Sequence, residues 1–309
     1  MSGFEDPNWP RGSAWLAGDS LPDTAGSVSV LGVPLNRSIT PGRCDLAPGA
    51  VRKAMHRLAT FDAAHHLDAR RVTCHDMGDL PLAETPPADA VAPVRSAMAD
   101  ALGQSEAVVL LGGDNAVTRP GVHGLGLPLD RVGLLTLDAH LDLRDTSGGL
   151  HNGNPVRALL DDGMPGNNIV QIGIAPFANS SHYMGVAMDA GITVVTLATA
   201  RSMDLQLLVH EHLLMLADRC DAIYVDLDMD VLDRAFAPAC PGARPGGLSP
   251  GAVAEACYEI GKHPKVRAMD VVEIDPTKDV NDCTCLAAGQ FLLSFATGVV
   301  RRLDGDGAY

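Results

Sequence analysis

The chain has 309 residues, 46% of them hydrophobic and 20% charged, which supplies core material for one large α/β domain or two small ones. Its 38 acidic and 23 basic residues give a net charge of −15 at pH 7, so nucleic acid and anionic membranes are poor partners. Seven cysteines without disulfide-type spacing, no signal-peptide pattern and no apolar run of the ~18 residues that span a membrane predict a soluble, cytoplasmic protein.

The order of elements predicts the fold. Residues 1–26 are rich in Gly, Pro, Ser and Asp, and we expect an irregular arm there. After it, nearly continuous apolar runs predict strands buried on both faces, at 27–35, 107–113, 131–139, 168–174, 192–197, 222–230 and 266–274. Helical patterns lie between them, at 49–58, 89–102, 204–219, 250–262 and 286–300. This alternation, without a linker or repeat, predicts a single domain at 27–309 built on a doubly wound parallel sheet.

Acidic residues collect where four of these strands end. Asp114 and Asn115 follow the second strand, and the third ends in the sequence Asp138-Ala-His140-Leu-Asp142. The sixth carries Asp226, Asp228 and Asp230, and the last carries Glu273 and Asp275. Ligands of doubly wound sheets bind at the carboxyl edge of the strands, so these side chains are expected to share one rim.

Such a cluster predicts a metal site. Carboxylates crowded in a partly buried site repel one another unless a cation neutralises them. Asp138, His140 and Asp142 alternate along an extended segment and can point to one side. Oxygen-rich ligation with an imidazole suits Mn²⁺ better than zinc. Strand-end aspartates can also be simple turn formers, but two such motifs favour the metal site.

These motifs resemble those of the ureohydrolase (arginase) family from about residue 30 to the C-terminus. GGDN (112–115) is similar to the family's GGDH, and DAHLDLR (138–144) matches its DAHxD. VDLDMDVLDRAFAP (225–238) resembles SxDxDxxDPxxAP, with Asp226 at the position of the Ser. EIDPTKD (273–279) is similar to the final segment, which carries a substrate-binding glutamate. The resemblance implies a three-layer α/β/α fold.

The resemblance also implies a site with two Mn²⁺ ions. One would be held by Asn115, Asp138, Asp142 and Asp228, and the other by Asp138, His140, Asp228 and Asp230. A hydroxide between the ions would be the nucleophile, and two cations lower the pKa of bound water. Asp142 would orient this hydroxide, and Glu273 would accept N–H bonds from an amidine-like head group.

Asn115 departs from the family pattern, because most members have His there. An amide oxygen ligates a hard cation more weakly than imidazole does. Asn115 can therefore mark a site that has lost a metal, or a formimidoylglutamase, since that branch includes members with Asn. We favour the second interpretation because every carboxylate ligand remains.

Arginines favour the formimidoylglutamase branch. DAHLDLR resembles its DAHFDLR, and GNPVR (153–157) resembles its GTPFR. Arg144 is the main candidate for binding a carboxylate of the substrate, because arginine pairs with carboxylates bidentately. Arg157 and Arg244 are weaker candidates, for which surface salt bridges are equally good explanations.

His151 follows TSGGL (146–150), which resembles the TSGN segment before the proton-shuttling histidine of arginases, so it is a candidate general acid. A surface position is the alternative. Cys44 and Cys240 lie in segments that are active-site loops in the family. We expect them at the mouth of the site, either as a reversible disulfide or as unpaired thiols.

The resemblance therefore implies a manganese enzyme that hydrolyses N-formimino-L-glutamate to glutamate and formamide in histidine breakdown. One alternative is hydrolysis of a guanidino compound such as arginine, agmatine or guanidinobutyrate, with release of urea. The other is a metal-poor, non-catalytic family member. The resemblance further implies a homo-oligomer, a trimer or hexamer, with a small amino-acid-derived substrate.

Overall fold

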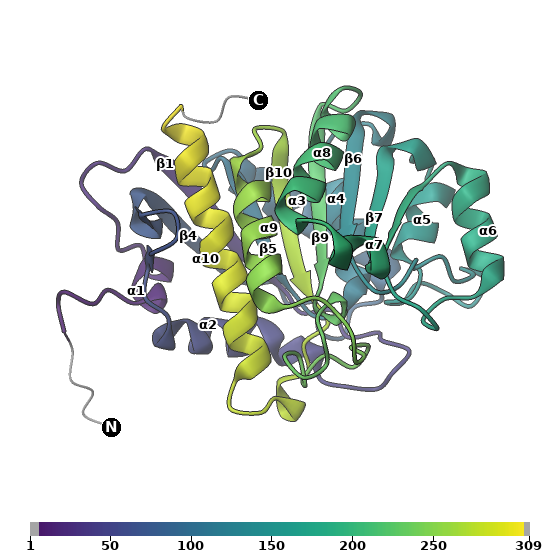
Figure 1. Ribbon diagram of the computed structural model, residues 1–309, viewed down its shortest axis with the longest axis horizontal. Helices are drawn as coiled ribbons and strands as arrows, with labels where there is room; N and C mark the ends of the chain where they lie inside the picture. Colours follow the sequence, from purple (N-terminus) through teal and green to yellow (C-terminus); the bar gives the residue numbers. More distant parts are fainter. Residues whose placement is uncertain (1–5, 306–309) are drawn as a thin grey trace.

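Eight parallel strands form one sheet. It lies at the centre of the molecule (Figure 1). The computed structural model describes residues 6–305. The order across the sheet is β4-β1-β5-β10-β9-β6-β7-β8. The strands are β1 (Gly26–Val33), β4 (Val72–Asp79), β5 (Ala107–Gly112), β6 (Val132–Leu137), β7 (Ile169–Ile174), β8 (Thr193–Thr196), β9 (Ala222–Asp228) and β10 (Val266–Val272). The short strands β2 (Phe61–Asp62) and β3 (Leu67–Asp68) pair only with each other.

Helices cover both faces of the sheet, which confirms the predicted three-layer, doubly wound fold. One apolar core holds buried residues of α2 (Ala47–Ala54), α7 (Leu197–Ser202), α8 (Leu205–Ala217), α9 (Pro250–Lys262) and α10 (Cys283–Leu303). The core on the opposite face holds those of α3 (Val91–Leu102), α4 (Thr118–Gly124), α5 (Pro155–Asp161) and α6 (Ser181–Ala190). Strand side chains alternate between the two cores, as the pleat requires.

All seven predicted strands are present, but β4, a further strand of the central sheet, was missed, as were the two short strands β2 and β3. β4 lies at the edge of the sheet, and only Val72 and Cys74 of its eight residues are buried. An edge strand with one covered face lacks the continuous apolar run on which the prediction relied. The shorter helices α4 to α7 were missed as well.

The stretch predicted as an irregular arm contains a short helix, α1 (Gly12–Leu16). Its Trp15 is fully buried, and the indole N–H donates to the carbonyl of Val72 at 2.9 Å. Residues 1–5 of that stretch lie outside the described part of the chain. The described part of the arm is thus fastened to the edge strand.

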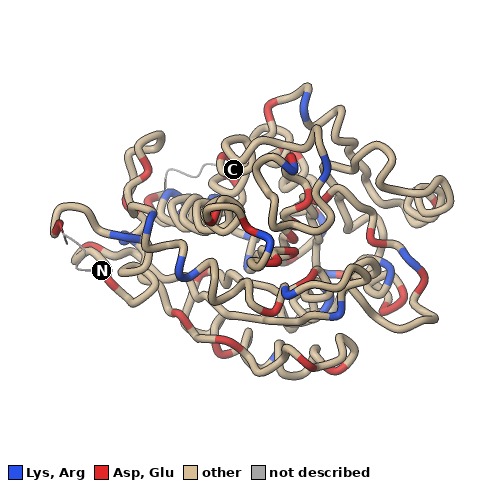
Figure 2. The backbone as a smooth tube through the Cα atoms, turned by 90° about the horizontal axis from the view of Figure 1, so that it is seen from below, with Lys and Arg blue, Asp and Glu red and all other residues tan. Residues whose placement is uncertain are grey.

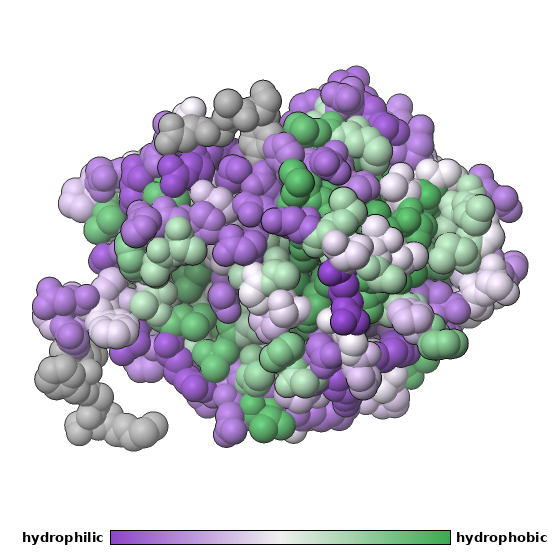
Figure 3. Space-filling view, viewed as in Figure 1, coloured by the Kyte–Doolittle hydropathy of each residue, from purple (hydrophilic) through white to green (hydrophobic). Residues whose placement is uncertain are grey.

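Helix α10 is long and apolar enough to cross a membrane by length and composition, with a mean hydropathy of 1.6. However, 78% of that window is buried inside the fold, where α10 packs beside α9 (Figure 1). Hydrophilic and hydrophobic side chains are interspersed on the face of the molecule seen in Figure 3. These observations identify α10 as a core helix.

The strand order brings together segments that are distant in the sequence. β9 and β10 come after β6 in the sequence but lie between β5 and β6 in the sheet. The carboxyl ends of β5, β10, β9 and β6 are therefore four consecutive positions along one rim. In the view of Figure 2, basic and acidic residues are mixed along the backbone. What distinguishes this rim is that its acidic side chains are buried.

Candidate functional site

The acidic residues predicted from the sequence meet at this rim. A cavity of about 180 Å³ opens there, and its walls include His140, Asp142, Asp228, Asp230 and Glu273. Asn115 and Asp138, which are 1% and 0% exposed, are buried at the same strand ends. A larger hollow, of about 1020 Å³, lies along the edge strand β4 and contains none of these residues.

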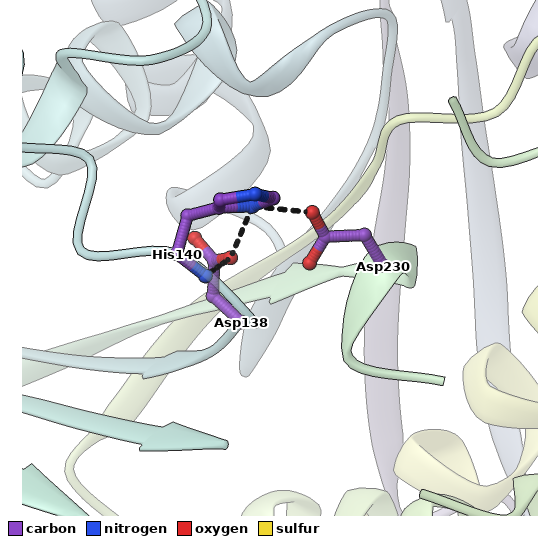
Figure 4. Close-up of side chains that lie close together, drawn as sticks. All are labelled: Asp138, His140 and Asp230. Atoms are coloured by element: carbon purple, nitrogen blue, oxygen red, sulfur yellow. Dashed lines mark hydrogen bonds and ion pairs between the residues drawn. The ribbon is translucent and has the colours of Figure 1, made fainter. Parts of the chain in front are cut away.

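The His140 side chain contacts the carboxylates of both Asp138 and Asp230 (Figure 4). Its Nδ1 atom lies 2.6 Å from a carboxylate oxygen of Asp230 and 3.6 Å from one of Asp138. Asp230 follows β9 in a short 3-10 turn (Met229–Val231), and it also accepts the backbone N–H of Ala139 at 2.9 Å. One atom from each of the three side chains lies within 4.8 Å of the others, so the three could hold one metal ion.

Asn115 and Asp142 form the second part of the cluster. The Asn115 amide nitrogen donates to Asp142 Oδ2 at 2.6 Å, and its oxygen accepts the Thr118 hydroxyl at 2.7 Å. Asp142 has a positive φ of 50°, which is unusual outside glycine and typical of residues held in place at functional sites. Thr118 was not singled out from the sequence, because nothing in its local pattern indicates a polar role.

Glu273 lines the same cavity in a similarly rare backbone conformation, with φ at 65°. Its Oε1 atom accepts the backbone N–H of Asn115 at 2.9 Å and the side-chain N–H of Asn152 at 3.0 Å. Asn152 in turn accepts the backbone N–H of Ile39 at 2.9 Å. One oxygen of Glu273 is thus fixed by the protein, and Asn152, which lines the cavity, was missed in the sequence.

Without a cation, the negative charges of this cluster are unfavourable. Burial, with the charge of Asp230, raises the pKa of Asp138 to about 7, and burial with the charge of Asp114 raises that of Glu273 to about 8. Burial and neighbouring carboxylates also hold the pKa values of Asp142 and Asp228 well above their usual range. For His140, burial alone would lower the pKa, but the nearby carboxylates raise it to about 11.

The donor atoms fit a hard divalent ion. The buried Oδ2 atom of Asp138 has no hydrogen-bond partner within residues 6–305, so this carboxylate oxygen is free to bind a cation. The other candidate ligands are carboxylate oxygens, one amide and one imidazole. This set suits Mn²⁺ better than zinc, which prefers sulfur and nitrogen.

The raised pKa values predict how the metal-free protein responds to pH. Asp114, Asp138 and Glu273 have folded-state pKa values of about 6, 7 and 8, whereas in the unfolded chain they ionise near 4. The stability that they contribute is complete below the unfolded pKa and is lost as the pH rises through the folded values. The melting temperature of the metal-free protein should therefore fall between pH 6 and 8, by on the order of 5 °C.

Calorimetry with and without Mn²⁺ checks this expectation. Bound cations keep the carboxylates ionised, so the loss between pH 6 and 8 should disappear when Mn²⁺ is present. A metal-free protein whose melting temperature is level or rises over this range would contradict the expectation.

Two arginines reach the cavity. Arg144 lines it, and also lines an adjoining cavity of about 210 Å³. Within the described residues the Arg144 guanidinium has no hydrogen bond or ion pair. Arg244 also lines the first cavity, and its guanidinium lies 2.9 Å from Nε2 of His140. Gly242 allows this loop to close, because a Cβ atom there would come within 2.4 Å of Asp230 Oδ2.

Two predicted residues lie elsewhere. His151 does not line the cavity; its Nδ1 accepts the backbone N–H of Gly153 at 3.0 Å, and its Nε2 lies 3.2 Å from the Asn154 amide nitrogen. Arg157 pairs with Asp161 one helical turn away, at 2.9 Å, and is also absent from the cavity wall. The candidate general acid, His151, and the weaker candidate for binding a substrate carboxylate, Arg157, thus do not line this cavity, whereas Asn152 of the same segment does.

The two cysteines expected at the mouth are buried. Cys44 and Cys240 are both 0% exposed and both free. The Cys240 sulfur lies 4.0 Å from a carboxylate oxygen of Asp228. Burial raises the pKa of the Cys44 thiol, with the charge of Glu273 adding to the effect. Such thiols are poor nucleophiles.

Comparisons with known proteins agree with this geometry. The model of the arginase family matches residues 26–298. A formimidoylglutamase of Halalkalibacterium halodurans is 34% identical over 274 residues, which are 87% of this chain and 86% of the relative. One from Bacillus subtilis is 31% identical over 303 residues, 96% and 95% of the two chains. The crystal structure of formimidoylglutamase from B. subtilis superimposes with a TM-score of 0.87 at 30% identity, covering 96% of this chain and 94% of that one.

Proposed function

The chain belongs to the arginase family, and we propose that it is a manganese-dependent hydrolase that cleaves N-formimino-L-glutamate into L-glutamate and formamide. The observation that carries this choice of substrate is Arg144. Within residues 6–305 its guanidinium has no hydrogen bond or ion pair, and it lines the same cavity as a cluster of buried carboxylates. A substrate that combines an amidine-like head with carboxylates matches both features. The similarity to relatives named formimidoylglutamase supports the proposal.

The proposed ligands of one Mn²⁺ ion are Asn115, Asp138, Asp142 and Asp228, and those of the other are Asp138, His140, Asp228 and Asp230. Two bound cations would lower the pKa of water and polarise the formimino group. The 2.6 Å contact from His140 to Asp230 supports this assignment, because the two residues would share one ion. Asn115 lies equally close to Asp142, but through its amide nitrogen.

The remaining side chains position the substrate and move protons. Glu273 has one oxygen fixed by Asn115 and Asn152, which leaves Oε2 to accept N–H groups of the formimino head. Arg144 would pair with a carboxylate of the glutamate moiety. In the reaction, water adds to the formimino carbon, the bond from this carbon to the glutamate nitrogen breaks, and that nitrogen gains a proton.

We assign the proton transfer to Asp142 rather than to His151. Asp142 lines the cavity among the other proposed ligands, so its carboxylate could accept a proton from water and pass it to the departing nitrogen. His151 has both ring nitrogens against Gly153 and Asn154 instead. Asp142 would therefore both orient the water and serve as the acid.

Hydrolysis of a guanidino compound remains the second candidate, since the same cluster could accept a guanidinium head. Arg144 separates the two proposals. An arginine facing the substrate repels a cation that carries no carboxylate, such as agmatine. A guanidino acid would still gain from it, and therefore belongs in the test.

Product release from a panel of substrates tests the proposal. The Mn²⁺-loaded protein should release formamide from N-formimino-L-glutamate, and the release should stop when a chelator removes the metal. Arginine, agmatine and guanidinobutyrate should yield no urea at comparable rates. Urea from any of them would replace the proposed substrate, and silence on the whole panel without retained metal would favour the non-catalytic alternative.

We also propose that the enzyme acts in the cytoplasm as a homo-oligomer, either a trimer or a hexamer. Seven free cysteines support a reducing compartment, and the family resemblance supports the assembly. Sedimentation at micromolar concentration tests the assembly, and a monomer would contradict it.

A further inference from the structure

Asn115 presents a problem for the proposed metal centre. Its amide nitrogen, which cannot bind a cation, is the atom that faces Asp142, at 2.6 Å. Its oxygen faces away and accepts the hydroxyl of Thr118 at 2.7 Å. To ligate an ion that it shares with Asp142, the amide must turn by half a rotation, so that its oxygen faces the ion and its nitrogen faces Thr118.

The hydroxyl of Thr118 can serve both orientations. A hydroxyl donates one hydrogen bond and accepts others, so Thr118 can donate to the oxygen of Asn115 or accept from its nitrogen. In the second case its own proton needs another acceptor. Asp270 Oδ2, at 3.3 Å, is within reach. This carboxylate is held in turn by the Tyr224 hydroxyl at 2.8 Å and by the backbone N–H of Leu227 at 3.2 Å.

We propose that Thr118 is the positioning residue that makes Asn115 a competent metal ligand. Resting on the proposed function, this inference adds a residue outside the ligand set. All members of the chain Asn115–Thr118–Asp270–Tyr224 are at most 1% exposed, so water does not replace a lost partner. Without the hydroxyl, the turned amide would leave its N–H₂ group buried with no acceptor, and the unturned amide offers the cation no oxygen.

Thr118→Val tests the inference, because valine keeps the shape and removes the hydroxyl. One of the two Mn²⁺ ions should bind about tenfold more weakly, which is typical for loss of a partner behind a ligand. The other ion should bind as in the wild type. Thr118→Ser keeps the hydroxyl and should retain both affinities. Metal analysis after desalting gives the stoichiometry, and electron paramagnetic resonance distinguishes a coupled Mn²⁺ pair from a single ion.

Thr136→Val is the matched control. Thr136 is 0% exposed, lies two residues before Asp138, and has no hydrogen-bond partner for its hydroxyl among the described residues. The same change there should leave both Mn²⁺ affinities within twofold of wild type. In an Asn115→Ala background, Thr118→Val should have no further effect, because the two residues act as one unit.

The outcomes separate this inference from the proposed function. If Thr118→Val keeps two ions at wild-type affinity, or weakens them equally in the Asn115→Ala background, the inference is wrong and the metal centre stands. If the wild-type chain retains no Mn²⁺, both fail. Should Thr118→Val not fold, Thr118→Ala removes the same hydroxyl with less bulk, and circular dichroism shows which variant is folded.

Discussion

Asp228→Asn is expected to lower kcat/KM for N-formimino-L-glutamate by more than 100-fold and to reduce the bound Mn²⁺ from two ions to one or fewer. Asp228 ends β9 and is the only proposed ligand of both ions besides Asp138. Loss of a partner behind a ligand already costs about 10- to 100-fold, so loss of a shared ligand should exceed this. Steady-state kinetics and metal analysis on the same preparation measure both effects.

The stability of the variant separates metal loss from misfolding. Burial and the charge of Asp230 raise the pKa of Asp228, so its charge is unfavourable in the metal-free fold. Asparagine removes that charge, and the metal-free variant should melt at or above the temperature of metal-free wild type at pH 8. Asp218→Asn, on the exposed end of α8, serves as the matched control and should keep full activity and metal content. Full metal content in Asp228→Asn would contradict the proposed ligand set.

Arg144→Ala is expected to lower kcat/KM for the same substrate by about 100-fold, which corresponds to about 2.7 kcal/mol for a lost charge-assisted pair. Most of the loss should lie in KM, since a carboxylate remote from the reacting carbon is bound in both the ground and the transition state. Mn²⁺ content should not change, because within residues 6–305 the Arg144 guanidinium makes no hydrogen bond or ion pair with any proposed ligand. Arg144→Lys should recover only part of the loss, because a lysine cannot form the bidentate pair.

Arg157→Ala provides the comparison within the same segment. The two arginines were both inferred from the sequence, but Arg157 pairs with Asp161 and is absent from the cavity wall. We expect kcat/KM to stay within twofold of wild type. Equal losses for the two variants would refute the use of Arg144, and an increased activity of Arg144→Ala on agmatine would show that the arginine also excludes cationic substrates.

The residues around position 151 show what a local sequence pattern cannot predict. His151 and Asn152 are neighbours, and the motif resemblance favoured the histidine. Which of the two faces the cavity depends on contacts from Ile39 and Glu273, more than 100 residues away on either side. The sequence near residue 151 contains no signal for these contacts. Thr118 was missed for a similar reason, since its partner Asp270 lies on β10, about 150 residues further along the chain.

The sequence by itself determined the fold class and the acidic rim. Buried strands in a parallel sheet require continuous apolar runs, and acids at their ends are visible as short local motifs such as Asp138-x-His140-x-Asp142. Only the tertiary structure decided which side chains face the cavity, because β9 and β10 insert between β5 and β6 and loops from distant segments close over the rim. The direction of a loop side chain follows from contacts made across the fold, and these have no counterpart in the local sequence.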